Sequence, residues 1–296
     1  MMEFVDTYSK IKKGKPFSGR QYLRNVALNT LSWIDRRSGA ESYLVRPRVQ
    51  FLYVHHIFKD EEVAFERLIN VLSKNHHFIS YAKAVEFILN QKIDRPYLVI
   101  SSDDGFKNNL RAAEILNKYD IKGCFFINPS VIDGLDDRKL IDYCRQKLHF
   151  PPVEFLNWRD VEQLQNWGHE IGSHSMNHYN LAVLANDQLQ EELVVSYHIL
   201  KERCGSPLHF AYPYGRFFHF NEDARKIVFN TGYHSCASAE RGCHVNPIIK
   251  MKNDELCILR DHILLDWPLN HVYYFIAKNA RNSKPENNYF SSLVSR

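Results

Sequence analysis

The sequence has 296 residues, of which 45% are hydrophobic and 24% are charged, so a large core is possible and a disordered chain is excluded. The formal net charge is only +4 and no clustered basic run is present, which argues against nucleic-acid binding. No stretch approaches the roughly 18–20 apolar residues of a membrane-spanning helix.

The first 46 residues are predicted to form an extension that packs on the rest of the chain. Apolar residues recur at helical spacing within residues 21–36, which predicts a helix there. They are Leu23, Val26, Ala27, Leu31 and Ile34. We expect this helix to lie across the main domain, and the alternative is a helix that binds a membrane surface or a partner.

Residues 47–296 are predicted to form one catalytic domain that ends in a C-terminal helix. Apolar strand patterns and amphipathic helix patterns alternate along it, which is typical of a parallel α/β sheet. The predicted strands are residues 49–54, 97–102, 123–127, 169–172, 208–212, 233–237 and 256–265. The predicted helices are residues 61–72, 82–89, 110–119, 158–167, 187–204 and 221–230. About seven strands favour a closed or nearly closed barrel, whose chemistry lies at the carboxyl ends of the strands.

Two adjacent carboxylates, Asp103 and Asp104, follow the apolar strand 97–102 directly. Like charges at a strand end repel each other, and a bound cation relieves that repulsion. One carboxylate would then bind the metal while the other acts as a base, and Gly105 permits the sharp turn that follows. Alone, the same residues are also typical of a turn that caps a helix.

Two further motifs carry polar chemistry. His174 and His178 are four residues apart, a spacing that lets both imidazoles reach one metal ion, although histidines are plentiful in this chain. The run Phe210-Ala211-Tyr212-Pro213-Tyr214-Gly215 predicts a rigid loop after a strand. Such a loop is able to direct backbone N–H groups at a developing oxyanion, or it is simply a turn.

In this order the three motifs resemble those of the polysaccharide deacetylase superfamily, which includes chitin, peptidoglycan and nodulation-factor chitooligosaccharide deacetylases. The resemblance spans roughly residues 49–265 and implies a distorted (β/α)7-type barrel. It implies one divalent metal ion, zinc first, with cobalt, nickel or manganese as alternatives. By the same resemblance Asp104, His174 and His178 bind the metal, Asp103 is the general base, and the Tyr214 N–H helps to stabilise the oxyanion. Tyr212, Pro213 and Tyr214 are then expected to contact the substrate.

The sequence departs from the family pattern in its third motif, and the general acid of the family has two candidates here. The third motif of the family usually begins with an arginine that orients the base, and Ala211 stands there in this chain. We expect Arg260 to supply that guanidinium by pairing with Asp103, against the alternative of a purely structural arginine. The general acid of the family is a late histidine, which predicts His262, with His244 as the second candidate. His55 and His56 are expected either to line the pocket or to pack.

These motifs predict a metal-dependent hydrolase that removes an N-acetyl group from an amino sugar or glycan in bacterial surface polysaccharide biosynthesis. No apolar signal segment is evident near the first residue, so we expect a cytoplasmic or membrane-peripheral protein that acts on an oligosaccharide or a sugar precursor. Two alternatives stay open: a catalytically silent carbohydrate-binding relative, and a hydrolase of formyl or non-sugar amide bonds.

Overall fold

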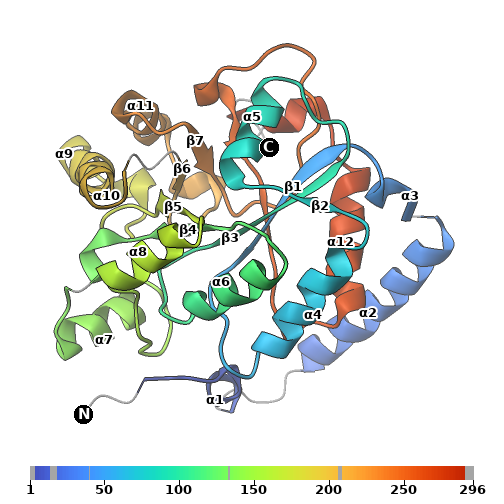
Figure 1. Cartoon of the computed structure of the whole chain (residues 1–296), viewed down its shortest axis with the longest axis horizontal. Helices are drawn as coiled ribbons and strands as arrows, with labels where there is room; N and C mark the ends of the chain where they lie inside the picture. The colour runs from blue at the N-terminus through green and yellow to red at the C-terminus, as the bar shows by residue number, and fades with distance from the viewer. Residues whose placement is uncertain (1–3, 14–18, 40, 133, 206–208, 291–296) are drawn as a thin grey trace.

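A computed structural model describes residues 4–13, 19–39, 41–132, 134–205 and 209–290. Its parallel strands form a nearly closed barrel surrounded by helices, as predicted (Figure 1). The strands are β1 (Arg48–Val54), β2 (His77–Phe78), β3 (Pro96–Ser102), β4 (Cys124–Ile127), β5 (Glu170–Ser173), β6 (His209–Ala211), β7 (Ser235–Ala237), β8 (Cys257–Ile258) and β9 (Arg260–His262). Their order around the sheet is β8-β7-β6-β5-β4-β3-β1-β9, with β2 paired to β3.

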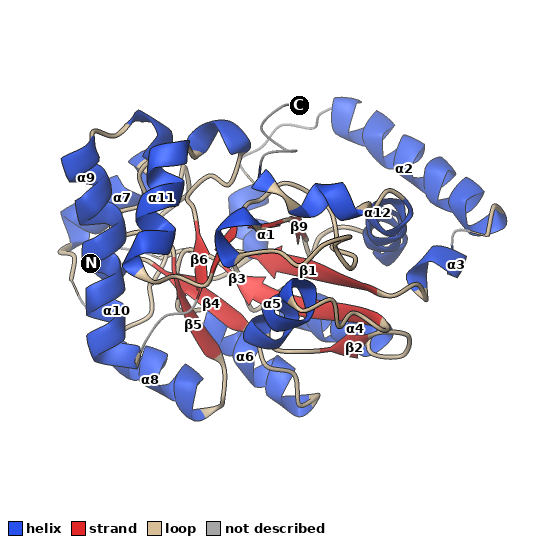
Figure 2. Ribbon diagram, turned by 90° about the horizontal axis from the view of Figure 1, so that it is seen from above, coloured by secondary structure: helices blue, strands red, loops and turns tan. Residues whose placement is uncertain are grey.

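The helices lie outside the strands (Figure 2). They are α1 (Tyr8–Lys12), α2 (Gly19–Arg37), α3 (Glu41–Leu44), α4 (Glu62–Leu72), α5 (Tyr81–Leu89), α6 (Asn109–Lys118), α7 (Asp137–Gln146), α8 (Trp158–Asn166), α9 (Asn186–Gln190), α10 (Ser196–Cys204), α11 (Glu222–Thr231) and α12 (Leu269–Arg281). A π-helical turn, Glu191–Val195, joins α9 to α10, so the single helix predicted over residues 187–204 contains a bulge. Among the described helices, none combines the length and hydrophobicity needed to cross a bilayer.

The predicted strand over residues 256–265 is two strands, β8 and β9, and this division brings the barrel close to closure. β8 pairs with β7, while β9 pairs with β1 at the other end of the strand order. At the break, the Leu259 N–H donates to His244 Nε2 at 2.9 Å. That N–H is therefore satisfied by a side chain, and one chain segment contributes a strand to each end of the sheet.

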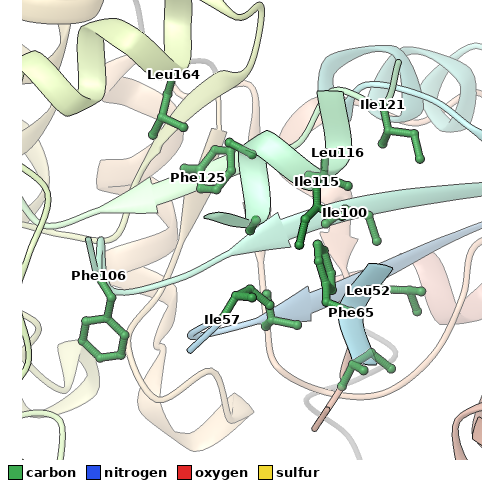
Figure 3. Close-up of a cluster of buried hydrophobic side chains, with 14 of the residues drawn as sticks. Leu52, Ile57, Phe65, Ile100, Phe106, Ile115, Leu116, Ile121, Phe125 and Leu164 are labelled. Atoms are coloured by element: carbon green, nitrogen blue, oxygen red, sulfur yellow. The ribbon is translucent and has the colours of Figure 1, made fainter. Parts of the chain in front are cut away.

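The main core lies between the sheet and its covering helices. The seven residues of β1 and the seven of β3 are all buried, as expected for parallel strands covered on both faces. Figure 3 shows side chains from β1, β3, α4 and α6 packed together, among them Leu52, Phe65, Ile100 and Ile115.

Strand register determines where the polar motifs meet. Val54 is paired with Ser102 at the ends of β1 and β3, so His55 and Asp103 leave the sheet side by side. Ser173 at the end of β5 is paired with Phe210 of β6, which brings the segment after Ser173 next to the loop after Ala211. The motifs that are far apart in sequence therefore gather at the carboxyl edge of the barrel.

Candidate metal centre and active site

A cavity of about 710 Å³ opens at this carboxyl edge. Both acidic residues of the first motif, both histidines of the second and two tyrosines of the third line it. The predicted site residues in its wall are Asp103, Asp104, His174, His178, Tyr212, Tyr214, Arg260 and His262. Pro213 connects the two tyrosines without lining the cavity itself, while His55 and His56 do line it.

Asp104, His174 and His178 form a compact buried cluster. Asp104 Oδ1 lies 3.4 Å from Nε2 of His174 and 3.4 Å from Nε2 of His178. One ligand atom from each of the three residues lies within 4.8 Å of the others. One carboxylate and two imidazoles, with room left for water and substrate, are the donor set of a catalytic zinc site.

The hydrogen bonds around the cluster also suit a metal ion. The Ala211 carbonyl lies 2.6 Å from His174 Nδ1 and can only accept, so Nδ1 carries the hydrogen and the Nε2 lone pair faces Asp104. Asp104 Oδ1 is buried without a hydrogen-bond partner among the described residues. A buried carboxylate oxygen without a donor is costly, and a cation at this point would satisfy it.

Two of the three residues have protonation states that suit ligation, whereas for His174 burial lowers the pKa but Asp104 and Asp103 outweigh burial and raise it. Burial lowers the pKa of His178 to about 3, so this imidazole is neutral at neutral pH. Burial alone would raise the pKa of Asp104, but the surrounding imidazoles of His174, His55 and His178 outweigh burial and lower it. The carboxylate is therefore ionised, as a metal ligand must be.

The loops that carry these residues adopt unusual backbone conformations. Asp104, Ser175, His178 and Tyr214 have φ values of 70°, 66°, 56° and 60°, in the left-handed region that side chains other than glycine rarely enter. Each such residue costs roughly 1–3 kcal/mol and persists where the surrounding structure holds it in place. Gly215 must be glycine, because a Cβ there would lie 2.2 Å from the Ala239 Cβ.

Two side chains hold the loop that carries His174 and His178. Asn128 donates to the carbonyl groups of His174 and Ser175. Glu192 accepts from the Asn177 backbone N–H at 2.9 Å and from its side-chain amide at 2.8 Å. Glu192 belongs to the π-helical turn and is buried, and π bulges of this kind are frequent at functional sites.

Arg260 makes two parallel hydrogen bonds to Asp103, at 2.7 and 2.8 Å, as expected. Both groups are buried, and the guanidinium also donates to the Ser238 carbonyl at 2.8 Å. Burial would raise the pKa of Asp103, but Arg260 and the nearby imidazoles outweigh it and lower that pKa. The second carboxylate is thus held ionised and in a fixed orientation beside the cluster of Asp104, His174 and His178.

His262 lies at the cavity in contact with a second histidine. Its Nε2 is 3.1 Å from Nδ1 of His55, and its ring stacks on Tyr53. Burial lowers the pKa of both histidines, and only for His55 do Asp104 and Asp103 oppose this shift. Burial therefore favours the neutral form of both rings. His244, the second candidate acid, uses both ring nitrogens within the fold, to Asn288 and Leu259.

The N-terminal extension reaches the mouth of this cavity. Val5, Tyr8, Lys10 and Ile11 line it, and the Tyr8 ring stacks on His56 with centroids 5.2 Å apart. The backbone N–H groups of Tyr8 and Ser9 donate to the Asp60 carboxylate at 2.8 and 2.9 Å, which fixes the start of α1.

Sequence reasoning missed two residues of this arrangement. Asn128 and Glu192 belong to no short motif, and only the three-dimensional structure brings them to the histidine loop. For His55 the sequence left lining the pocket and packing open, and this residue lines the cavity.

Comparisons with known proteins agree with this geometry. Residues 90–236 match the family model described as polysaccharide deacetylase, a range that includes the three motifs but neither Arg260 nor His262. No curated protein matches the chain.

Three solved structures share its fold. IcaB from Ammonifex degensii is 15% identical with a TM-score of 0.62, and the alignment covers 80% of this chain and 98% of that one. The Streptococcus pyogenes deacetylase PplD, in complex with acetate, is 16% identical with a TM-score of 0.60, covering 77% and 98%. The BpsB deacetylase domain from Bordetella bronchiseptica is 15% identical with a TM-score of 0.57, covering 75% and 96%.

Proposed function

The chain carries a domain of the polysaccharide deacetylase family, hydrolases of non-peptide carbon–nitrogen bonds, and on this premise we propose that it is a metal-dependent N-deacetylase of an amino sugar. The substrate is a bacterial surface glycan, an oligosaccharide of it or one of its sugar precursors. The observation that carries this proposal is the buried cluster Asp104, His174 and His178 beside the Asp103–Arg260 pair, in one cavity.

Asp104, His174 and His178 would hold one divalent ion, with zinc as the first choice for this donor set. The bound ion would polarise the acyl carbonyl and make water easier to deprotonate. Asp103 is the general base, because it is ionised, buried and oriented by two hydrogen bonds from Arg260. Arg260 is a positioning residue for Asp103, in the role that Ala211 is unable to fill.

The leaving amine needs a proton, and the His55–His262 pair is the donor we propose. The rings are 3.1 Å apart between Nδ1 of His55 and Nε2 of His262, so a proton is able to pass between them. Both rings line the cavity, and we propose His262 as the acid, with His55 as the ring that orients it. The Tyr214 N–H, in its left-handed loop, is the proposed oxyanion donor.

The test combines metal content with product release from N-acetylated amino sugars and their oligomers. We expect about one divalent ion per chain and acetate release that falls at least ~10³-fold in Asp103→Asn, with metal content unchanged. Asp94→Asn, an exposed carboxylate away from the cavity, is the matched control. Release of formate in place of acetate would support a formyl hydrolase. Glycan binding without release of either acid would support a catalytically silent carbohydrate-binding relative. A chain that binds no divalent metal would contradict the proposal.

A further inference from the structure

Helix α2 contacts the rest of the protein through its polar side. Its buried residues are Leu28, Ser32 and Asp35. Ser32 Oγ donates to the Asn270 carbonyl at 3.1 Å, and Asp35 accepts from Arg281 at 3.1 Å, both on α12. Asn29 Oδ1 lies 2.8 Å from His271 Nε2 of the same helix. Figures 1 and 2 both place α2 at the periphery of the molecule, next to α12.

The apolar side of α2 faces away from the barrel, contrary to what an ordinary packed helix would show. Six large apolar side chains of this helix are between 42% and 68% exposed. They are Tyr22, Leu23, Val26, Leu31, Trp33 and Ile34. At ~100° per residue they occupy about half of the helix circumference, opposite the buried side. Exposed apolar groups that form a contiguous patch indicate an interaction surface.

The charges around this patch are of one sign. Arg20, Arg36 and Arg37 are exposed on α2, and the guanidinium of Arg37 lies 4.3 Å from the centre of the Trp33 ring. Asp35 is the only acidic residue of α2, and it is turned inward and paired with Arg281. The outer surface of the helix therefore offers apolar groups, two aromatic rings and guanidinium groups, without a carboxylate.

We propose that α2 docks the protein onto a membrane surface that contains anionic lipids. Apolar side chains on one face, flanked by arginines and aromatic rings, are the features of a helix that lies in the lipid interface. The guanidinium groups complement the lipid phosphates. A second copy of the chain would instead bring arginine against arginine, with no carboxylate on the facing helix to offset the repulsion. This proposal does not depend on the proposed deacetylase activity.

The experiment is cosedimentation of the full chain with phosphatidylcholine vesicles, with and without phosphatidylglycerol. We expect binding that needs the anionic lipid and weakens with added salt. The triple substitution Leu23→Gln, Val26→Gln, Ile34→Gln should weaken binding more than about tenfold, because it removes apolar groups that would enter the lipid. Ile248→Gln with Ile249→Gln is the matched control, since these residues are 74% and 68% exposed outside α2.

A charge variant tests the second part of the proposal. Arg20→Gln, Arg36→Gln, Arg37→Gln should reduce binding to the anionic vesicles, whereas Arg138→Gln with Arg145→Gln, exposed on α7, should not. Circular dichroism confirms that each variant folds. Absence of vesicle binding would overturn the proposal, as would equal losses in the control variants. Sedimentation velocity tests the alternative. If the protein binds no lipid but forms a dimer that the apolar triple substitution dissociates, then a second copy of the chain covers α2 instead.

Discussion

The cavity at the strand ends and the outer side of α2 both depart from the usual distribution of side chains, in which polar groups are exposed and apolar groups are buried. The cavity buries carboxylates and imidazoles, while α2 exposes leucine, valine, isoleucine and tryptophan. Buried polar groups and exposed apolar patches are the deviations that carry information about function. The two regions differ in whether the fold itself offsets the unfavourable placement. Arg260 neutralises the buried Asp103 within the fold, whereas nothing among the described residues covers the apolar outer side of α2.

The largest effect is expected from removing a residue of the metal cluster. Asp104→Ala should lose both the metal ion and activity, with acetate release at least ~10³-fold below wild type. Metal that binds only the folded state stabilises it, by about 2.7 kcal/mol at a concentration of 100 times Kd. Thermal unfolding with and without added zinc should therefore show a metal-dependent rise in Tm in wild type but not in Asp104→Ala. A retained rise in the variant would place the metal elsewhere.

The Asp103–Arg260 pair should contribute the next largest effect, on stability. Arg260→Met leaves Asp103 buried without its partner, which we expect to cost about 3–5 kcal/mol in the free energy of unfolding. The double substitution Asp103→Asn with Arg260→Met should cost less than the sum of the two single ones, because neither charge then stays uncompensated. Urea unfolding of the three variants measures this coupling, and strictly additive losses would show that the pair is not coupled.

The same pair predicts the direction of a pH effect. The pKa of Asp103 is lowered in the folded protein, so the carboxylate stabilises the fold above its ordinary value of 3.8. That stability should be lost as the pH falls below this value towards the folded pKa, because the unfolded chain then binds the extra proton. In Asp103→Asn the decline in the free energy of unfolding below pH 3.8 should be shallower than in wild type.

Glu192→Gln tests whether the hydrogen bonds between Glu192 and the histidine loop contribute to metal affinity. Glu192→Gln weakens the hold on the Asn177 N–H groups, and we expect metal affinity to fall by about 10–100-fold, as for other groups that orient metal ligands. Glu191→Gln is the matched control, because Glu191 is exposed in the same π-helical turn. Equal affinities in the two variants, from metal titration, would reduce Glu192 to a structural role.

The barrel and the two motifs that meet in the buried Asp104–His174–His178 cluster could be predicted from sequence because each depends on local patterns. The apolar run before Asp103 marks a buried strand, and the spacing of His174 and His178 suggests shared ligation. The pairing of Arg260 with Asp103 could also be anticipated, since the guanidinium missing at Ala211 has to come from another segment.

Other features depend on tertiary contacts that no local pattern encodes. β2 is two residues long and carries no periodicity. α7, by contrast, has a local signal that the sequence prediction missed, because Asp136 caps the helix by accepting from the Lys139 N–H. At the break between β8 and β9 the Leu259 N–H donates to His244, a residue for which the sequence alone suggested a catalytic role instead. For α2 the periodicity predicted the helix correctly but did not indicate which side faces the barrel.

The smallest effect on the free energy of unfolding should come from substitutions on the outer side of α2. Leu23→Gln removes a side chain that is 68% exposed, so we expect the free energy of unfolding to change by less than about 0.5 kcal/mol. Leu52→Ala, in the core, should cost about 2–5 kcal/mol because it leaves a cavity. Urea unfolding without lipid compares the two. A loss above ~1 kcal/mol for Leu23→Gln would mean that the apolar side of α2 is covered by another part of this chain, and the contrast between the two regions would then disappear.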